Sequence, residues 1–365
     1  MKHPPASGDS AASVTTEGEV FASEPQRIEY LPVDIPEPGA YAEVAPGIVW
    51  VRIPMPMDLN HINLWLLEDG AGWTLIDSGL GSDMGRETWE KLEVALFKRR
   101  PLKRIFITHL HPDHIGLAHW LQQRHRVPVW MSIRGLRLAQ LFAREPTPEE
   151  ASVAQGFMRS HGFTDQQVLS RFFSGKMYRT AVSGIPDVEH SPSDGDEIAI
   201  GDGRWQVLET NGHAEGHQCL NNAARRILIS GDQILPTISS NVSFGPRSDD
   251  MNPLKSYLDS LQRLSLLDKQ SLVLPSHGRP FFGLQARASD LITHHRAHLA
   301  ALEAACVTPK NAFELLPVIF KRRLIGSNWM FAMGEIIAHL EYLAQNGVLE
   351  RRTVGGGTIH YLRTK

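Results

Sequence analysis

Seven residues that follow a short apolar run decide how this sequence is interpreted: Thr108-His109-Leu110-His111-Pro112-Asp113-His114. The run before them, residues 104–107, reads RIFI and predicts a buried strand. In an extended segment, side chains two positions apart project to the same side, so His109 and His111 can bind one cation. Pro112 forces a bend, after which Asp113 and His114 can face a second cation nearby.

Imidazole nitrogens together with a carboxylate suit a borderline divalent metal. Zinc fits best, manganese and iron are alternatives, and the nitrogen content disfavours calcium. The competing interpretation is an ordinary polar surface loop. Three histidines and one aspartate within residues 109–114, directly after a buried strand, favour the metal site.

Apolar runs separated by turn residues predict two β-rich halves around this stretch. The predicted strands are 47–53, 62–67, 73–76, 104–107, 197–200, 205–208, 226–229 and 271–274. Helical spacing predicts helices at 82–97, 116–122, 253–267 and 283–305, the first with Ser82 as its N-cap. Two β-rich halves with helices outside predict an α+β fold in which two packed sheets are covered by helices on both outer faces.

The length of 365 residues exceeds the size at which a single core usually stops growing, so we expect more than one domain. Residues 1–28 are predicted to be a flexible tail, and its opening lacks the apolar stretch of a secretory signal. Residues 29–305 are predicted to form a catalytic domain with a helical insertion at about 132–179. Residues 306–365 contain two amphipathic helices and a Gly-tipped hairpin, an order that resembles a winged helix.

Composition narrows the classes of partner. Lys and Arg number 37 against 40 Asp and Glu, so the net charge of −3 gives no global attraction to nucleic acid or an anionic membrane. No apolar run is long enough to span a bilayer. Two cysteines, Cys219 and Cys306, cannot build a disulfide framework, which favours a reducing compartment. We expect a cytoplasmic protein that acts on a small molecule, with a homodimer as a possible assembly.

The stretch at 108–114 resembles the HxHxDH signature of the metallo-β-lactamase superfamily. Other segments resemble further motifs of that superfamily in the same order, and they are residues 74–79, 211–217, 230–232 and 275–278. Asn211 stands where the family commonly has proline. The resemblance extends over about residues 43–277 and implies a four-layer αββα sandwich with one or two metals at the end of the sheets.

The same resemblance implies a ligand set. His109, His111 and His213 would bind one metal, Asp113, His114 and His277 the other, and Asp232 would bridge the two. Two Zn²⁺ ions are expected, with Mn or Fe as alternatives. Such a pair lowers the pKa of a shared water from about 15.7 towards 7, so that this metal-bound water, together with Asp113, performs hydrolysis without a Ser or Cys nucleophile.

Several polar residues near the motifs receive supporting roles. Asp77 is interpreted as a group that orients a ligand histidine. His217 has three open interpretations, namely the same orienting role, contact with substrate, or stabilisation of a turn. A cluster of histidines later in the chain, at positions 294, 295 and 298, falls on a charged predicted helix and is expected to form a solvated face rather than a second metal site.

The substrate must be inferred from the parts outside the shared motifs. Asp113 and His114 occur in the form shared with glyoxalase II, thioesterases, lactonases and nucleases, and the C-terminal module most resembles glyoxalase-like hydrolases related to the lactamase-β-2 group. The leading hypothesis is hydrolysis of a thioester, such as an acyl-CoA or acyl-glutathione, or of another ester or a lactone. Apolar residues of the insertion would wall an acyl pocket, and they are Leu136, Leu138, Leu141, Phe142 and Phe157. Candidate substrate contacts are Tyr178, Arg179 and Asn241.

Other functions stay open. A phosphodiesterase or ribonuclease uses the same metal pair, and a winged helix often binds nucleic acid. The hairpin, however, carries only four basic residues, Arg351, Arg352, Arg363 and Lys365, which disfavours that function. A hydrolase of another small molecule, such as a xenobiotic-degrading enzyme, is a further alternative. A non-enzymatic metal-binding scaffold is the last, with the C-terminal module serving packing or dimer contacts.

Overall fold

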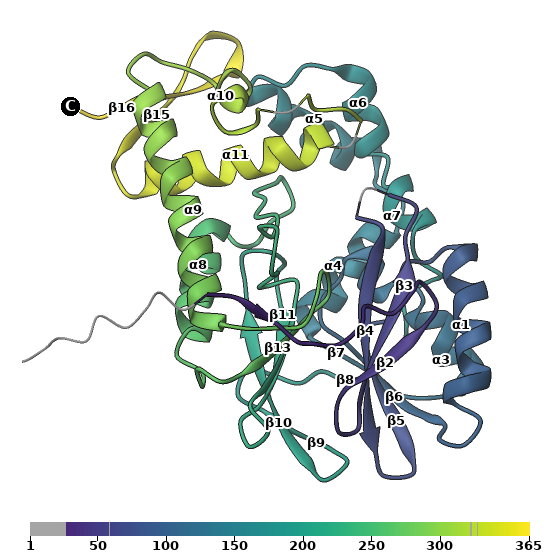
Figure 1. Ribbon diagram of the computed structural model, residues 1–365. Coiled ribbons are helices and arrows are strands. Elements are labelled where there is room, and N and C mark those ends of the chain that lie inside the picture. The colour runs from purple at the N-terminus through teal and green to yellow at the C-terminus, as the bar shows by residue number, and fades with distance from the viewer. Residues whose placement is uncertain (1–26, 58, 322, 327) are drawn as a thin grey trace, which may run out of the picture.

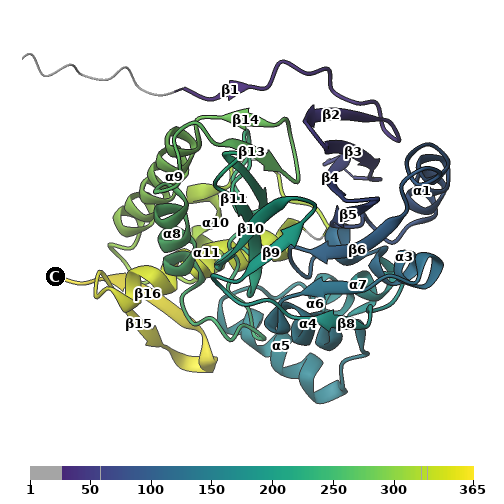
Figure 2. The ribbon, with the colours of Figure 1, turned by 90° about the horizontal axis from the view of Figure 1, so that it is seen from below.

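The computed structural model describes residues 27–57, 59–321, 323–326 and 328–365, so most of the predicted tail lies outside the described residues. Two seven-stranded sheets lie face to face, and helices cover their outer faces (Figures 1 and 2). The predicted α+β sandwich is confirmed. A further group of helices and a two-stranded hairpin lies at one end of the sandwich (Figure 1).

The first sheet is built from the N-terminal half of the chain. Its strands, in spatial order, are β2 Tyr41–Ala45, β3 Ile48–Pro54, β4 His61–Asp69, β5 Gly72–Ile76, β6 Leu102–Ile107, β7 Val129–Met131 and β8 Val188–His190. Pairing is antiparallel from β2 to β5 and parallel from β5 to β8. The carboxyl end of β6, where the histidine-rich stretch begins, therefore lies among parallel neighbours.

The second sheet is built from the later half, with one N-terminal strand at its edge. Its strands, in spatial order, are β1 Glu29–Tyr30, β14 Phe281–Phe282, β13 Leu272–Pro275, β12 Ile227–Gly231, β11 His217–Asn222, β10 Gly203–Thr210 and β9 Glu197–Ile200. β12 and β13 are parallel, so the two segments that follow them, Asp232 and the turn at His277, emerge at the same edge.

Helices cover the outer faces of both sheets and also form the insertion. They are α1 Asp83–Leu96, α2 Pro112–Ile115, α3 Ala118–His125, α4 Ile133–Ala143, α5 Pro148–Ser160, α6 Gln166–Phe172, α7 Lys176–Thr180, α8 Pro253–Leu264, α9 Leu284–Ala305, α10 Ala312–Ile319 and α11 Asn328–Gln345. The predicted N-cap of α1 is confirmed, because the Ser82 hydroxyl accepts a hydrogen bond from the Gly85 N–H. After α11 the chain forms the hairpin of β15 Leu349–Thr353 and β16 Ile359–Arg363.

Alternating side chains explain why the sheets stack. In β3, Ile48 and Trp50 face the second sheet, whereas Val49 and Val51 face the layer of α1 and α3. Both faces of this strand are apolar and buried, which is what a strand between two packed layers requires. The core between the sheets is completed by residues of the second sheet such as Trp205, Leu220 and Leu274.

The insertion and the C-terminal region pack against each other. Phe163, which follows α5, contacts Phe313 of α10 and Trp329 of α11, with ring centroids 5.8 and 5.9 Å apart. Phe172 of α6 contacts Phe331 of α11 at 6.3 Å. These contacts join α5 and α6 to α10 and α11, which lie above the sandwich in Figure 1.

Some features were not predicted from the sequence. β7 and β8 have only three residues each, and β11 reads HQCLNN, whose polar side chains hide a strand that is buried throughout. The expected solvated face of histidines on α9 is wrong for His295, which is fully buried because α11 packs over it. Among the described residues, no helix combines the length and apolar character needed to cross a membrane.

Asn63 on β4 ties the two sheets together at the edge that carries the histidine motifs. Its side chain is fully buried, and its Nδ2 donates to the carbonyl oxygens of Pro275 and Gly278 at 2.9 and 2.8 Å. Its Oδ1 accepts a hydrogen bond from Trp50 Nε1 at 2.8 Å. The turn that holds His277 is thus fixed to the first sheet by a residue more than 200 positions earlier.

We predict that Asn63→Ala lowers the free energy of unfolding by roughly 2–4 kcal/mol, because it leaves buried partners of three hydrogen bonds unpaired. Urea denaturation measures this difference. The exposed Asn346→Ala, which removes one hydrogen bond at the end of α11, is the matched control and should change stability by less than about 0.5 kcal/mol. Equal midpoints for the two variants would contradict the role of Asn63.

Candidate metal centre

The histidine-rich stretch begins where β6 ends and continues into the short helix α2. Thr108 and His109 extend the strand direction and are fully buried. His111 precedes α2 with an extended backbone, and Pro112 begins the helix. This change of direction places His114 on the helix, with its ring centroid 3.9 Å from that of His109.

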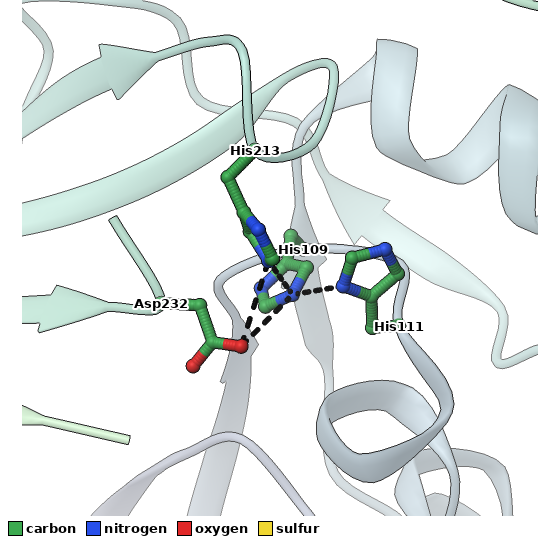
Figure 3. Close-up of side chains that lie close together, drawn as sticks. All are labelled: His109, His111, His213 and Asp232. Atoms are coloured by element: carbon green, nitrogen blue, oxygen red, sulfur yellow. Dashed lines mark hydrogen bonds and ion pairs between the residues drawn. The ribbon is translucent and has the colours of Figure 1, made fainter. Parts of the chain in front are cut away.

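A first group of side chains consists of His109, His111, His213 and Asp232 (Figure 3). His109 Nε2 lies 2.9 Å from His111 Nδ1 and 3.3 Å from His213 Nε2. Asp232 Oδ2 lies 3.5 Å from His213 Nε2 and 4.0 Å from His109 Nε2. A tetrahedral zinc ion with bonds of about 2.0–2.1 Å separates neighbouring ligand atoms by about 3.3 Å. The spacing of these four groups therefore suits a divalent metal.

A second group, made of Asp113, His114 and His277, lies beside the first. His277 Nε2 is 3.3 Å from Asp113 Oδ2 and 3.5 Å from Asp232 Oδ1. His114 Nε2 is 3.7 Å from Asp113 Oδ2 and 3.4 Å from Asp232 Oδ2. One oxygen of Asp232 thus faces His277, and the other faces His114 and the first group. The structure brings together all seven side chains of the expected ligand set.

Hydrogen bonds leave a free lone pair on the inward nitrogen of most of these rings. In four of the five histidines Nδ1 is bonded to an oxygen, which leaves Nε2 directed at the other ligand atoms. The contacts are His109 to Thr108 Oγ1 at 3.0 Å, His114 to Asp77 Oδ2 at 2.8 Å, His213 to the Asn241 carbonyl at 2.8 Å and His277 to the His61 carbonyl at 2.9 Å. Such a bond on the outer nitrogen is typical of metal-binding histidines.

Three buried atoms in the cluster have no hydrogen-bond partner among the described residues: His114 Nε2, His277 Nε2 and Asp232 Oδ1. Buried polar atoms are normally paired, because an unpaired one costs about 1–3 kcal/mol. All three point into the space between the two groups. A cation there would satisfy them together, so the residues fit the metal that the site implies.

The charges point the same way. Burial would raise the pKa of Asp113, but the facing His114 and His277 lower it to about 2. Burial would lower the pKa of His277, but Asp232 and Asp113 raise it to about 10. By contrast, burial and the neighbouring imidazoles keep the pKa of His109 well below its usual value. The two carboxylates thus attract positive charge, which a divalent cation would supply in place of the protons on His114 and His277.

Asp77 supports the rings of His114 and His109 from their outer side. Its Oδ2 accepts a hydrogen bond from His114 Nδ1, and its Oδ1 accepts one from the Thr108 N–H at 2.8 Å. The Thr108 hydroxyl also donates to this carboxylate and lies 3.0 Å from His109 Nδ1. Asp77 has a positive φ of 62°, a region that Asp and Asn tolerate better than most residues.

His217 lies behind Asp232. It is fully buried, its Nε2 accepts a hydrogen bond from the Asp232 N–H at 3.2 Å, and its Nδ1 lies 2.8 Å from Thr210 Oγ1. Of the three interpretations left open by the sequence, this geometry favours the orienting role over contact with substrate. Gly231, at φ 53°, must be a glycine here, since a Cβ would lie 2.4 Å from His217 Nε2.

The candidate substrate residues lie in varied surroundings. The Tyr178 hydroxyl donates to the Leu110 carbonyl at 2.7 Å, which ties α7 to the histidine-rich loop. Arg179 donates to carbonyl oxygens of Arg144 and Ser174 within the insertion. Asn241 contributes its backbone carbonyl to His213 and its side chain to Glu335. The sequence analysis did not predict, for any of these three residues, the hydrogen bonds that the structure shows.

The residues expected to wall an acyl pocket do not all lie in one place. Leu136, Leu138 and Phe142 pack partly buried against the core of the first sheet, and Phe157 packs against Phe244. Leu141 lines a pocket whose other lining residues are Glu149, Glu150, Val153, Ala154, Pro246 and Arg247. This pocket lies between α4, α5 and the segment before α8.

Two supporting residues escaped the sequence analysis. Thr108 stands inside the motif, and its hydroxyl beside two histidines was a local signal that could have identified it. Asn63 gave no local signal, because its partners at Pro275 and Gly278 are adjacent only after the two sheets have packed.

We predict that Asp77→Asn weakens zinc binding by about 10- to 100-fold, because an amide cannot accept hydrogen bonds from both Thr108 and His114 as the carboxylate does. Competition with a chromophoric chelator measures the affinity. The exposed Asp83→Asn, on the first turn of α1, should bind zinc like the parent chain. Equal zinc affinities of the two variants would show that Asp77 does not support the metal centre.

Comparisons with known proteins agree with this geometry. The crystal structure of a beta-lactamase domain protein from Burkholderia ambifaria is 37% identical, with a TM-score of 0.85, and the match covers 92% of this chain and 98% of that one. The probable metallo-hydrolase YqjP of Bacillus subtilis is 28% identical over 81% of this chain and 92% of its own length. The human acyl-coenzyme A thioesterase MBLAC2 is 27% identical over 66% of this chain and 82% of its own.

Two protein-family models match the chain. The one described as "Metallo-beta-lactamase-like, C-terminal domain" matches residues 299–364. The one described as "Metallo-beta-lactamase superfamily" matches residues 57–277, well over half of the chain, and that range contains all seven clustered residues. The chain therefore belongs to the metallo-beta-lactamase superfamily and is a metallo-hydrolase.

Proposed function

We propose that this metallo-hydrolase cleaves an acyl thioester, such as an acyl-CoA or acyl-glutathione, at a centre holding two Zn²⁺ ions. The observation that carries the two-metal centre is the position of Asp232, whose carboxylate lies between the two groups, with one oxygen facing His277 and the other facing both His114 and His213. His109, His111 and His213 would hold one ion, and Asp113, His114 and His277 the other.

When bound, the two ions lower the pKa of a water molecule and stabilise negative charge on the carbonyl oxygen of the substrate. Water adds to the carbonyl carbon, the C–S bond breaks, and a carboxylic acid and a thiol are released. The chain's own residues fix the geometry, with Asp77, His61 and Asn241 setting the direction of the rings. We propose that Asp113, whose Oδ2 lies beside both His114 and His277, would accept a proton from the attacking water.

The described cysteines give no competing nucleophile. Cys219 and Cys306 are both buried and unpaired by any disulfide. Burial raises the pKa of the Cys219 thiol to about 12 and that of Cys306 to about 11, so both stay protonated at neutral pH. An acyl transfer through a cysteine thiolate is therefore disfavoured, which supports attack by water.

The pocket beside the insertion supports a substrate with an apolar part. Leu141, Val153, Ala154 and Pro246 give it an apolar wall, and its charged lining residues are Arg247, Glu149 and Glu150. The relative from human, described as an acyl-coenzyme A thioesterase, supports the thioester class, although at 27% identity. A cytoplasmic location and a homodimer stay predictions.

No observation in the C-terminal hairpin favours nucleic acid. Arg351 pairs with Glu341 at 3.1 Å, Arg352 with Glu350 at 2.6 Å, and Arg363 with Glu303 at 3.1 Å. Three of the four basic residues named in this region, Arg351, Arg352 and Arg363, are thus already paired with carboxylates. A small-molecule substrate fits this surface better than RNA does.

We predict that the zinc-loaded chain hydrolyses members of a panel of acyl-CoAs and acyl-glutathiones, with thiol release followed by a chromogenic thiol reagent. His111→Ala should lower kcat/KM by about 10²- to 10³-fold or more, because it removes charge stabilisation from the reacting centre. His360→Ala, in the C-terminal hairpin, is the control and should match the parent chain. Turnover of a lactone or phosphodiester panel without any thioester turnover would reject the thioester assignment.

We also predict that elemental analysis finds about two zinc ions per chain more in the parent than in a chain whose centre is disabled by His111→Ala and Asp113→Ala, and that chelation abolishes hydrolysis until zinc is restored. Asp232→Asn should lose metal from both groups, because its carboxylate lies between them. Full activity of a metal-free preparation would overturn the proposed mechanism.

A further inference from the structure

A second cluster of histidines lies where α9 and α11 cross, outside the seven-residue centre (Figure 1). His295 and His298 are one turn apart on α9, and Glu335 and His339 are one turn apart on α11. Each pair therefore lies on one side of its helix. The two pairs meet across the helix contact, with the rings of His298 and His339 5.6 Å apart.

The distances in this cluster suit a metal. One ligand atom each from His298, Glu335 and His339 lies within 4.8 Å of the other two. His339 Nδ1 donates to the Glu335 carbonyl at 2.7 Å, which leaves a lone pair on its Nε2. This is the same arrangement of the outer nitrogen that four histidines of the main centre show. His295 Nδ1 donates a hydrogen bond to His339 Nε2 at 3.0 Å, and an ion bound to His339 would displace that hydrogen bond.

Two ring nitrogens of the cluster are buried without a hydrogen-bond partner among the described residues, His295 Nε2 and His298 Nδ1. Helices packed by apolar contact alone have no need of such groups, because each unpaired one costs about 1–3 kcal/mol. Buried neutral histidines beside a buried carboxyl group are, however, what a nitrogen-rich metal site requires.

The charges at the cluster leave room for a cation. His298 is half-buried and His339 is fully buried. From the described part of the chain, no salt bridge reaches the Glu335 carboxylate, which accepts a hydrogen bond from Asn241 Nδ2 at 3.3 Å. The nearest helix carries Arg296, but its side chain belongs to a pocket with Asp259 and Tyr342.

We propose that His298, Glu335 and His339 form a further binding site for a divalent metal, with zinc as the best match. The nitrogen-rich set favours zinc over calcium or magnesium, and His295 or a water molecule completes the four positions. The site clamps α9 to α11 and does not depend on the proposed thioesterase activity.

The clamp also reaches the main centre. Glu335 Oε2 accepts a hydrogen bond from Asn241 Nδ2 at 3.3 Å, and the Asn241 carbonyl accepts one from His213 Nδ1 at 2.8 Å. An ion that fixes the Glu335 carboxylate therefore holds the segment that orients His213. Through this route the C-terminal helices act as positioning elements for the centre at the end of the sheets.

Zinc titration of the full chain by calorimetry, after metal removal, tests the proposal. His298→Gln should bind one zinc ion fewer than the parent chain, and so should Glu335→Gln, whose amide keeps the shape of the side chain and an oxygen for Asn241. His294→Gln changes an exposed histidine on the same helix, outside the three-atom set, and should bind as many ions as the parent.

The same loss of one ion should appear when the variants are repeated in a chain whose main centre is disabled by His111→Ala and Asp113→Ala. This background separates the inference from the proposed function, because the readout is binding and not hydrolysis. Circular dichroism verifies that each variant is folded. Equal stoichiometry of folded Glu335→Gln, His298→Gln and parent chain would overturn the proposal.

Discussion

The attraction between two buried carboxylates and the ring nitrogens around them is the constraint on which the rest of the structure depends. Asp113 and Asp232 are held ionised next to five histidines, because the facing His114 and His277 lower the pKa of both carboxyl groups against the opposing effect of burial. A charge buried in this way is costly unless it is paired. A divalent cation would pair both carboxylates at once, and metal binding would then be linked to the stability of this end of the sheets.

The scaffold answers this constraint by fixing each ring from its outer side. Backbone carbonyls of His61 and Asn241, the Asp77 carboxylate and the Thr108 hydroxyl each bind one Nδ1. These partners come from the first sheet and the loops that follow its strands, and from the segment after β12. The direction of the inward nitrogen is therefore set by the scaffold in four of the five rings, and such preorganisation is what hydrolysis at a metal centre needs.

The insertion and the C-terminal helices form a second layer around this edge. Aromatic contacts join α5 and α6 to α10 and α11, and the Tyr178 hydroxyl ties α7 to the loop that holds His109 and His111. The shared sandwich supplies the chemistry, whereas these added elements surround the approach to it. Differences in substrate between members of such a fold arise from parts of this kind.

The sequence by itself determined the strands and helices with strong periodicity and the sandwich, because each of those signals lies within a few neighbouring positions. The seven clustered residues were implied by the resemblance of five short segments to the motifs of the metallo-β-lactamase superfamily. It did not determine β11, whose polar side chains look like a loop, nor the role of Asn63, nor the burial of His295. Those features arise from contacts between segments far apart in the chain, such as His295 with His339 and Asn63 with Gly278. Only tertiary packing determines these features. The surroundings of a side chain depend on the distant element that covers it, and the pattern of neighbouring residues does not identify that element.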